Sequence, residues 1–271
     1  MNASDFSIPT RTLVLAMVNQ DGRLDVPALY EMAELCGLTD QQVRLCLRRL
    51  VVDGSIRQDS GRGRRAVFIA APGVASMMLP ELKYLQLAYR QDAGMWPWDE
   101  MWHLVAFSVP ESRRAARDTF RGHLRFLGGA PVPGGFYVCA NDWGDEVLAE
   151  ATRLEIADGL SALTSRDLKV GGVSEPRTLA GKLWDLANLE AEWIAFEQRL
   201  ASSTKSAPDS LLRIVEFAQI MERDPLLPSE LLPPDWAGRR ARASMAASTD
   251  ITDSSDIPLT QAMHALLTQA R

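Results

Sequence analysis

The segment Thr39-Asp-Gln-Gln-Val-Arg-Leu-Cys-Leu-Arg-Arg-Leu-Val-Val-Asp-Gly-Ser-Ile-Arg-Gln-Asp-Ser-Gly-Arg-Gly-Arg-Arg-Ala-Val-Phe68 contains the signals for a helix and then a β-hairpin. Thr39 or Asp40 can cap the helix, and Gly54 ends it. Four apolar residues at helical spacing are expected to pack inward, namely Val43, Leu47, Leu50 and Val51. A helix followed by a basic hairpin is typical of a winged helix-turn-helix.

Two further helices are predicted before this segment, over Pro9–Asn19 and over Val26–Cys36, the second capped by Asp25. After it, two short strands are predicted at Ser55–Gln58 and Ala66–Ala70, joined by a turn at Gly61-Arg62-Gly63. Together these elements predict a three-helix winged domain over residues 1–71.

The charge of this segment contrasts with that of the whole chain. Between residues 41 and 65 there are seven arginines and two aspartates, a local charge of +5. Since the whole chain of 271 residues has a net charge of −6, the remainder carries −11. A local positive patch on an acidic protein favours docking of one face to a polyanion.

Double-stranded DNA is therefore the predicted partner of this domain. In a winged helix the third helix enters the major groove with its N-terminal end, where glutamine can contact adenine and arginine can contact guanine. Arginines further along the helix and in the wing suit phosphates or the minor groove. The predicted DNA-binding residues are Gln41, Gln42, Arg44, Arg48, Arg49, Arg57, Arg62, Arg64 and Arg65.

A helical connector is predicted over residues 72–95, within an apolar helix over Gly73–Asp92 that Pro80 can kink. A denser block follows over residues 96–172, with Gly-rich turns between its elements. The order of its elements is βαββαβ, the ferredoxin-like arrangement. Its predicted elements are strand Trp102–Val109, helix Ser112–Leu127, strands Ala130–Val132 and Phe136–Ala140, helix Asp142–Ile156 and strand Leu163–Val170.

Residues 173–271 are predicted to form an all-helical C-terminal domain. A long amphipathic helix is expected over Pro176–Leu200, followed by a loop over Ser202–Asp209. The fold class is therefore α+β in three parts. The remaining elements are a helix over Leu211–Arg223, an ordered turn or short helix over Pro225–Trp236, a helix over Asp235–Met245, a polar segment over Ser248–Asp256 and a terminal helix over Pro258–Ala270.

Composition places the chain among soluble cytoplasmic proteins. Apolar residues make up 46% and charged residues 24%, and no apolar run is long enough to span a membrane. The first residues lack the pattern of a secretory signal. Three widely spaced cysteines, Cys36, Cys46 and Cys139, suit thiols in a reducing compartment better than a disulfide framework or a zinc site.

Three segments of the chain resemble the PaaX family of bacterial transcriptional repressors. Leu38–Gly54 is similar to the recognition helix of that family, and Trp102–Tyr137 is similar to its middle part. The most specific match is Asp224–Gly238, which resembles the signature Asp-Pro-x-Leu-Pro-x-x-Leu-Leu-Pro-x-Asp-Trp-x-Gly. One departure is that Phe217-Ala218 stands where the family usually has an aromatic residue followed by arginine.

The resemblance implies a homodimeric repressor of an aromatic-catabolic operon that an aryl-CoA thioester such as phenylacetyl-CoA releases from its operator. Arginines could hold the phosphates of such an effector, and tryptophan could contact its acyl group. The same arginines are equally consistent with a solvated face paired with acids. The candidate effector-binding residues are Arg113, Arg117, Arg121, Arg213, Arg223 and Trp236.

Other function classes remain open on the sequence. A winged helix can also serve as a protein-interaction module. A ferredoxin-like domain also resembles the small nucleases of CRISPR systems, but the first strand ends with Phe107-Ser108-Val109-Pro110, without the aspartate that would bind their metal. We predict no catalytic residues, no metal site and no cofactor, because the three histidines lack metal-like spacing and no nucleotide-binding or nucleophile motif is present.

Overall fold

The computed structural model describes residues 10–18, 22–71, 79–203 and 207–248. The chain divides into two compact units, which are described separately. Unit 1 comprises residues 1–86, 195–219 and 241–271, and unit 2 comprises residues 87–194 and 220–240. Helices α5 (Leu79–Asp92), α9 (Leu186–Ser202), α10 (Ala207–Met221) and α11 (Ala237–Ser248) each contribute residues to both units.

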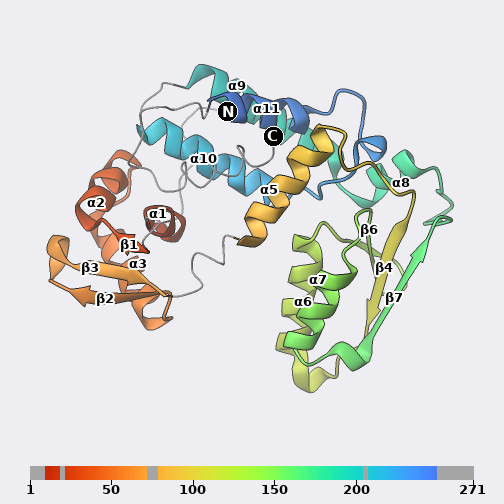
Figure 1. Ribbon diagram of the computed structural model, residues 1–271, viewed down its shortest axis with the longest axis horizontal. Helices are drawn as coiled ribbons and strands as arrows, with labels where there is room; N and C mark the ends of the chain where they lie inside the picture. Colours follow the sequence, from red (N-terminus) through yellow and green to blue (C-terminus); the bar gives the residue numbers. More distant parts are fainter. Residues whose placement is uncertain (1–9, 19–21, 72–78, 204–206, 249–271) are drawn as a thin grey trace. The chain divides into compact units, whose positions relative to one another are not determined.

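Unit 1 begins with three helices and a three-stranded antiparallel sheet in the order β1-β3-β2 (Figure 1). Within the sheet Leu24 pairs with Phe68, and Arg57 pairs with Ile69. The elements in chain order are α1 (Thr10–Ala16), β1 (Arg23–Leu24), α2 (Val26–Leu35), α3 (Asp40–Val52), β2 (Ile56–Ser60), the 3-10 turn η1 (Gly63–Arg65) and β3 (Val67–Ala70).

Local chemistry explains where these helices start and stop. Asp25 caps α2 by accepting a hydrogen bond from the N–H of Ala28 at 3.1 Å. Gly37 and Gly54 follow α2 and α3 with positive φ values of 74° and 75°, a conformation that favours glycine at a helix end. The predicted helices and hairpin of residues 1–71 are thus present, with ends shifted by a few residues.

The core of unit 1 gathers apolar residues from all three helices and the sheet. Val43, Leu47 and Leu50 of α3 are buried, as predicted. The prediction that Val51 packs inward is wrong, because Val51 is 39% exposed. The buried positions follow one face of α3, and Val51 lies beside that face at the last turn.

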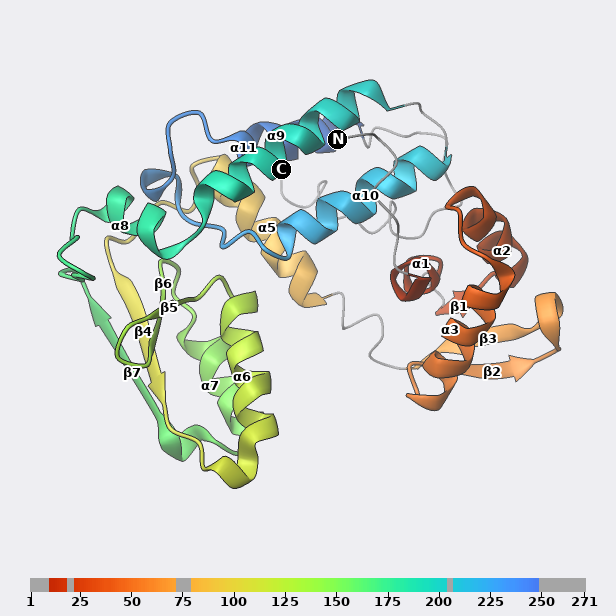
Figure 2. The ribbon, with the colours of Figure 1, turned by 180° about the vertical axis from the view of Figure 1, so that it is seen from behind.

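Unit 2 contains a four-stranded antiparallel sheet in the order β5-β6-β4-β7. With helices after β4 and β6, the connection order is βαββαβ, as predicted. Figure 2 shows α6 and α7 side by side against one face of this sheet. The elements are β4 (Trp102–Phe107), the 3-10 turn η2 (Glu111–Arg113), α6 (Arg114–Phe126), β5 (Ala130–Val132), β6 (Phe136–Cys139), α7 (Gly144–Arg153), the 3-10 turn η3 (Ala157–Gly159) and β7 (Leu160–Ser165).

The two faces of this sheet are covered differently. On the helical face, Val105 packs in a buried cluster with Phe120 and Leu124 of α6. On the other face, the ring of Trp102 stacks on that of Trp184, with centroids 6.3 Å apart. Strand β4 is therefore buried on both sides over its first four residues.

Several boundaries in unit 2 differ from the prediction. The last strand is Leu160–Ser165 rather than Leu163–Val170, because antiparallel pairing places Leu160 opposite Phe107. The predicted start of the helix at Ser112 also differs from the structure. A 3-10 turn precedes α6, and Arg113 occupies the N-cap position without a side-chain cap.

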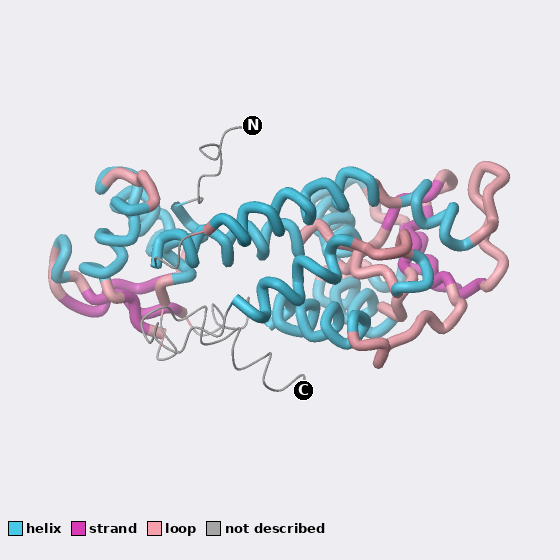
Figure 3. Tube along the Cα trace, turned by 90° about the horizontal axis from the view of Figure 1, so that it is seen from above, coloured by secondary structure: helices cyan, strands magenta, loops and turns pink. Residues whose placement is uncertain are grey.

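The predicted long helix over Pro176–Leu200 is two helices, α8 (Pro176–Leu183) and α9. Trp184 between them is extended, with φ −117° and ψ 141°. Asp185 then accepts a hydrogen bond from the N–H of Asn188 at 3.3 Å, which starts α9. Chain order continues with α10, the 3-10 turn η4 (Ser229–Leu231) and α11, and Figure 3 shows these helices in cyan.

The predicted connector helix is described over Leu79–Asp92, with Pro80 as the second described residue. The first part of that prediction, residues 73–78, lies outside the described residues, as do the predicted polar segment and terminal helix over residues 249–271. None of the described helices is long and apolar enough to cross a membrane. The three cysteines are free thiols, and burial raises the pKa of Cys139 to about 12.

Candidate functional site

The predicted DNA-binding residues all lie on the surface of unit 1. Five belong to α3, one to β2, and three to the turn between β2 and β3. Every one of their side chains is exposed, so none is a core residue. The exposed residues are Gln41, Gln42, Arg44, Arg48, Arg49, Arg57, Arg62, Arg64 and Arg65.

A capping box fixes the N-terminal end of α3. The Oγ1 atom of Thr39 accepts a hydrogen bond from the N–H of Gln42 at 3.3 Å. In return the Oε1 atom of Gln42 accepts from the N–H and the hydroxyl of Thr39, at 2.8 Å and 2.9 Å. Gln42 therefore holds the helix end, while its neighbour Gln41 is exposed without such a bond to the cap.

The turn between β2 and β3 has a defined shape. Gly61 has a φ of 72°, and a Cβ atom there would lie 2.1 Å from the carbonyl oxygen of Arg65, so only glycine fits. The side chain of Gln58 donates to the carbonyl oxygen of Gly61 at 2.6 Å. The arginines of the turn are thus presented from a fixed backbone.

Arg64 connects this turn to the N-terminal end of α3. Its guanidinium donates to Asp40 at 3.1 Å and lies 4.9 Å from the ring centre of Tyr30. The turn and the first residues of α3 consequently share one surface. The sequence predicted both groups of residues but gave no sign of the contact that joins them.

Several of these arginines have no carboxylate partner among the described residues. Arg57 pairs with Asp59 at 3.1 Å, and Arg44 lies 3.8 Å from Asp40. The remaining arginines of the set form no ion pair with any residue in the described part of the chain, and their positive charge is available to a polyanion. They are Arg48, Arg49, Arg62 and Arg65.

Asp53, at the C-terminal end of α3, is held by neighbouring groups. The Ser55 side chain and then Arg11, at 2.7 Å, donate hydrogen bonds that lower the pKa of Asp53 to about 2. Arg11 also donates to Ser55 at 3.2 Å. These bonds join α1 to the end of α3 and fix the start of the hairpin.

The candidate effector residues on α6 of unit 2 are engaged in separate contacts. Arg113 donates to the carbonyl oxygens of Glu155 and Leu154, at 2.6 Å and 2.8 Å, and so caps the C-terminal end of α7. Arg117 pairs with Glu111 at 2.8 Å. These bonds agree with the alternative that the arginines of α6 pair with acids.

The other candidate effector residues are also engaged or buried. In unit 1, Arg213 pairs with the buried carboxylate of Glu216, which also accepts from Arg199 at 2.7 Å. In unit 2, Trp236 is 5% exposed, and its Nε1 atom has no hydrogen-bond partner among the described residues. Arg223 pairs with Glu192 at 2.6 Å.

Unit 2 contains an open groove of about 650 Å³ beside the C-terminal end of α6. Arg125 of α6, Trp184 between α8 and α9, and Arg223 after α10 line it. Of the predicted effector residues, Arg223 alone is among those that line this groove. Trp184 falls inside the helix predicted over Pro176–Leu200, and the break between α8 and α9 places it at the groove.

Backbone contacts fix the walls of the groove. The indole N–H of Trp184 donates to the carbonyl oxygen of Gly128 at 2.9 Å. Gly128 has a φ of 86°, and a Cβ atom there would lie 2.5 Å from the carbonyl oxygen of Pro225. The groove is electrically balanced, since Asp185 and Glu222 accompany the two arginines.

The Asp224–Gly238 segment is largely internal. Asp224 is 4% exposed and accepts hydrogen bonds from the indole N–H of Trp193, at 3.0 Å, and from the N–H of Leu226, at 2.9 Å. A Cβ atom on Gly238 would lie 2.5 Å from Nε1 of Trp236. Asp224 and Gly238, which match the signature, therefore have structural roles.

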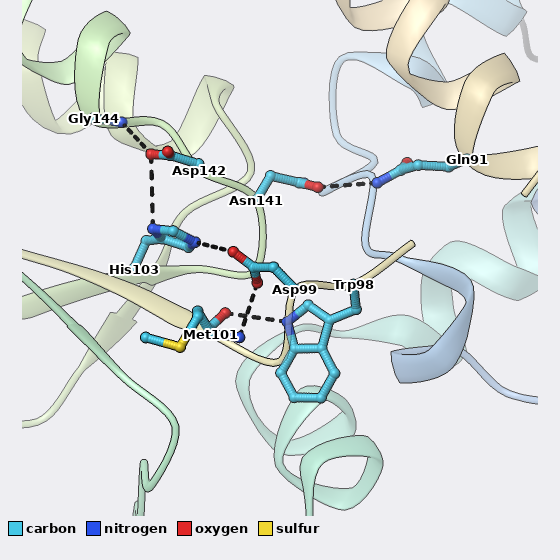
Figure 4. Close-up of polar contacts among 8 residues, drawn as sticks. All are labelled: Gln91, Trp98, Asp99, Met101, His103, Asn141, Asp142 and Gly144. Carbon is cyan, nitrogen blue, oxygen red and sulfur yellow. Dashed lines mark hydrogen bonds and ion pairs between the residues drawn. The ribbon is translucent and has the colours of Figure 1, made fainter. Parts of the chain in front are cut away.

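A polar cluster that the sequence did not reveal surrounds His103 of β4 (Figure 4). The ring lies between Asp99 and Asp142, with nitrogen–oxygen distances of 3.1 Å and 3.7 Å, and His103 is 8% exposed. Asp142 also accepts from the N–H of Gly144 at 3.0 Å. The described residues include no group of three or more His, Cys, Asp or Glu side chains arranged to hold a metal ion.

Comparison with known proteins identifies two parts of the chain. Residues 96–180 match the model described as the PaaX protein central Cas2-like domain. Residues 184–256 match the PaaX-like protein C-terminal domain. No curated protein matches the chain.

The fold as a whole is similar to a solved structure, the uncharacterized protein Rv0674 from Mycobacterium tuberculosis. The TM-score is 0.56 at 18% sequence identity, over 97% of this chain and 99% of that one. The two matched domain models together extend over more than half of the chain. The chain belongs to the PaaX family.

Proposed function

We propose that the chain is a DNA-binding transcriptional repressor, acting in the cytoplasm as a homodimer, and that residues 1–71 form its winged helix-turn-helix domain. The observation that supports this most is the exposed basic surface of unit 1. It joins the N-terminal end of α3 to the β2–β3 turn through the contact between Arg64 and Asp40. Seven arginines and two aspartates over residues 41–65 give this surface its positive charge.

Within this proposal the residues have different roles. The N-terminal end of α3 enters the major groove, where Gln41 and Arg44 contact base edges. Gln42 positions the helix, because its Oε1 atom is already bonded to Thr39. The arginines that contact phosphates, or the minor groove in the case of the turn, are Arg48, Arg49, Arg57, Arg62, Arg64 and Arg65.

Binding of the protein to the DNA upstream of its own operon tests the proposal. We expect affinity to fall steeply with salt concentration, and replacement of Arg62, Arg64 and Arg65 by alanine to weaken binding to every duplex and to reduce the salt dependence by about three ions. Arg114→Ala, Arg153→Ala and Lys169→Ala together remove the same charge from exposed positions of unit 2. That control is expected to bind normally.

The outcome also separates the two uses of a winged helix. A protein-interaction module would not bind DNA even at low salt. Equal weakening by the two triple variants would show that net charge, rather than the basic surface of unit 1, governs binding.

We further propose that an aryl-CoA thioester releases this repressor from the operator of an aromatic-catabolic operon. This follows from the family and from the groove of unit 2. Trp184 offers an aromatic surface to an acyl group, and Arg125 and Arg223 lie at the groove for negatively charged groups. Arg125 has no ion-pair partner in the described residues.

Thermal unfolding in the presence of aryl-CoA thioesters, free CoA and free aryl acids tests the effector class. We expect stabilisation by the thioesters and a loss of most of that stabilisation in Arg125→Ala. Arg114→Ala, on the same helix but outside the groove, is the control. Stabilisation by free acids alone would exclude the CoA thioester as effector, and equal responses of the two variants would exclude the groove.

A further inference from the structure

The two edges of the unit 2 sheet are unequal. The edge strand β5 has three residues, and one of them, Pro131, has no N–H to donate. The edge strand β7 has six residues, Leu160–Ser165, without proline and without any charged side chain. Its four inner residues are exposed and its two ends are half-buried. Strand β7 therefore lacks the features by which proteins protect a free sheet edge.

The pairing with β4 determines which backbone groups of β7 remain free. The N–H of Ser108 donates to the carbonyl oxygen of Gly159 at 2.9 Å, in the same register that pairs β4 with β7. Hydrogen-bonded residues alternate along an antiparallel strand, so every second residue from Gly159 bonds toward β4. The residues between them, Leu160, Ala162 and Thr164, direct their N–H and C=O groups away from β4.

We propose that β7 pairs antiparallel with β7 of a second copy of this chain, about a twofold axis that passes beside Ala162. This deepens the proposed homodimer, on which it rests, by giving its interface and register. The outward-directed N–H and C=O groups of one copy must pair with those of the other copy. Ala162 therefore faces Ala162 of the second copy, and Leu160 faces Thr164 of the second copy. The two four-stranded sheets then form one continuous sheet of eight strands.

Charge supports a second copy as the occupant of this edge. Antiparallel pairing brings Asp158, in the 3-10 turn that precedes β7, to the end of the second copy's β7 that Arg166 directly follows, and the twofold axis repeats this pair of opposite charges. Asp158 makes no ion pair with any described residue, and Arg166 lies 3.4 Å from Glu100 with both side chains exposed. The side chains along β7 are thus uncharged, and the residues that flank its two ends have opposite charges. The edge is therefore complementary to the same edge of a second copy in antiparallel orientation.

An exposed apolar side chain lies where the second copy would cover it. Leu163 is 45% exposed and lies opposite Leu104, on the sheet face that α6 and α7 do not cover. In the proposed register Leu163 is diagonal to Leu163 of the second copy, within reach of a side-chain contact. Pairing would therefore bury an apolar group as well as complete the backbone hydrogen bonds.

The test is a charge exchange in the full-length protein, followed by sedimentation equilibrium. Asp158→Arg and Arg166→Asp each place like charges opposite one another twice, and each is expected to weaken dimerisation about tenfold or more. The double variant restores opposite charges and is expected to return the dissociation constant to within about threefold of the original. Arg153→Asp, an exposed change on α7, is the control and leaves dimerisation unchanged.

Crosslinking tests the register independently. In a background with Cys36 and Cys46 changed to serine, Ala162→Cys is expected to form an intermolecular disulfide on oxidation, because facing Cα atoms lie about 5.5 Å apart. Leu163→Cys, one residue along, is expected not to crosslink, since its diagonal separation is too large.

Three results would overturn the proposal. They are a dimer unaffected by any charge variant, a double variant no better than either single one, and crosslinking through Leu163→Cys but not Ala162→Cys. A protein that is monomeric yet binds its operator would also overturn this interface, while leaving the DNA-binding proposal intact. Loss of DNA binding with an unchanged β7 dimer would contradict the DNA-binding proposal and leave this interface intact.

Discussion

Arg64 donates a hydrogen bond to Asp40 at 3.1 Å, although 24 residues separate them along the chain. The same guanidinium lies over the ring of Tyr30 on α2. The β2–β3 turn is thereby attached to the end of α3 that the proposed function directs into the major groove. Asp40 is itself an acid at this surface, so it has two opposing effects on DNA binding.

Asp40→Ala separates those effects. Removal of the carboxylate takes away roughly 1 kcal/mol of repulsion toward phosphate, so affinity for random duplex should rise about fivefold. Arg64 loses its anchor, and the ratio of operator to random affinity should fall. Fluorescence anisotropy with both duplexes measures the two quantities. Asp59→Ala, which frees Arg57 in β2, should leave the ratio unchanged, and equal ratios in both variants would refute the anchoring role.

Thr39, Gln41 and Gln42 are expected to differ although they lie close together. Thr39→Ala removes the N-cap of α3 and should lower the free energy of unfolding by about 1 kcal/mol, and Gln42→Ala should have a smaller effect in the same direction. Gln41→Ala should leave stability within about 0.5 kcal/mol while weakening operator binding. Urea unfolding and anisotropy on the three variants decide this. A destabilised Gln41→Ala, or a Gln42→Ala that loses base discrimination without losing stability, would reverse the two assignments.

The elements that the sequence predicts well depend on local signals. The helix α3 has its cap at Thr39 and its stop at Gly54, and the βαββαβ order follows from strands and helices punctuated by glycine. Such signals lie within a few residues of the element that they define. They predict which elements exist more accurately than where they end.

The break between α8 and α9 has one local signal, the N-cap residue Asp185, which the apolar spacing outweighed. The apolar residues continue at helical spacing through Leu179, Leu186 and Trp193, which predicts one helix. The helix ends because Trp184 bonds to Gly128, 56 residues away, and Asp185 starts a new one. A bond of that range depends on the tertiary fold, and the groove that Trp184 lines could not be located without it.

The contacts of the candidate effector arginines could not be predicted for a similar reason. Arginines at helical spacing on α6 look like a ligand-binding face in the sequence. In the structure Arg113 is bonded to the end of α7, 41 residues away from Leu154. Whether an arginine is available to a ligand depends on acids and carbonyl groups that the fold brings to it, and periodicity has no information about these.

Two glycine-to-alanine substitutions at the groove are expected to change the free energy of unfolding in opposite directions. Gly128→Ala forces a Cβ atom to within 2.5 Å of the carbonyl oxygen of Pro225 at a positive φ, and should cost about 2 kcal/mol or more. Gly122→Ala, inside α6 with no atom within 4 Å of the new methyl group, should stabilise by up to about 1 kcal/mol. Urea unfolding at one pH compares them. A Gly128→Ala variant as stable as the parent would show that this wall is not rigid.

His123 predicts a dependence of stability on pH in unit 2. Burial lowers the pKa of its imidazole below the usual 6.5, and Glu150 opposes the shift only in part. Its Nε2 atom is buried without a hydrogen-bond partner among the described residues. Because the unfolded chain binds the proton more readily, the contribution of this histidine to stability is full above pH 6.5 and is lost as pH falls below it.

His123→Phe removes this titration while keeping a ring near Phe126. We expect the free energy of unfolding of the parent to fall relative to that of the variant between pH 7.5 and pH 5.5, with the difference nearly constant above pH 7.5. Urea unfolding at several pH values in that range measures the difference. Parallel curves for the two proteins would mean that His123 binds its proton equally well in both states, and that its ring is not desolvated in the folded protein.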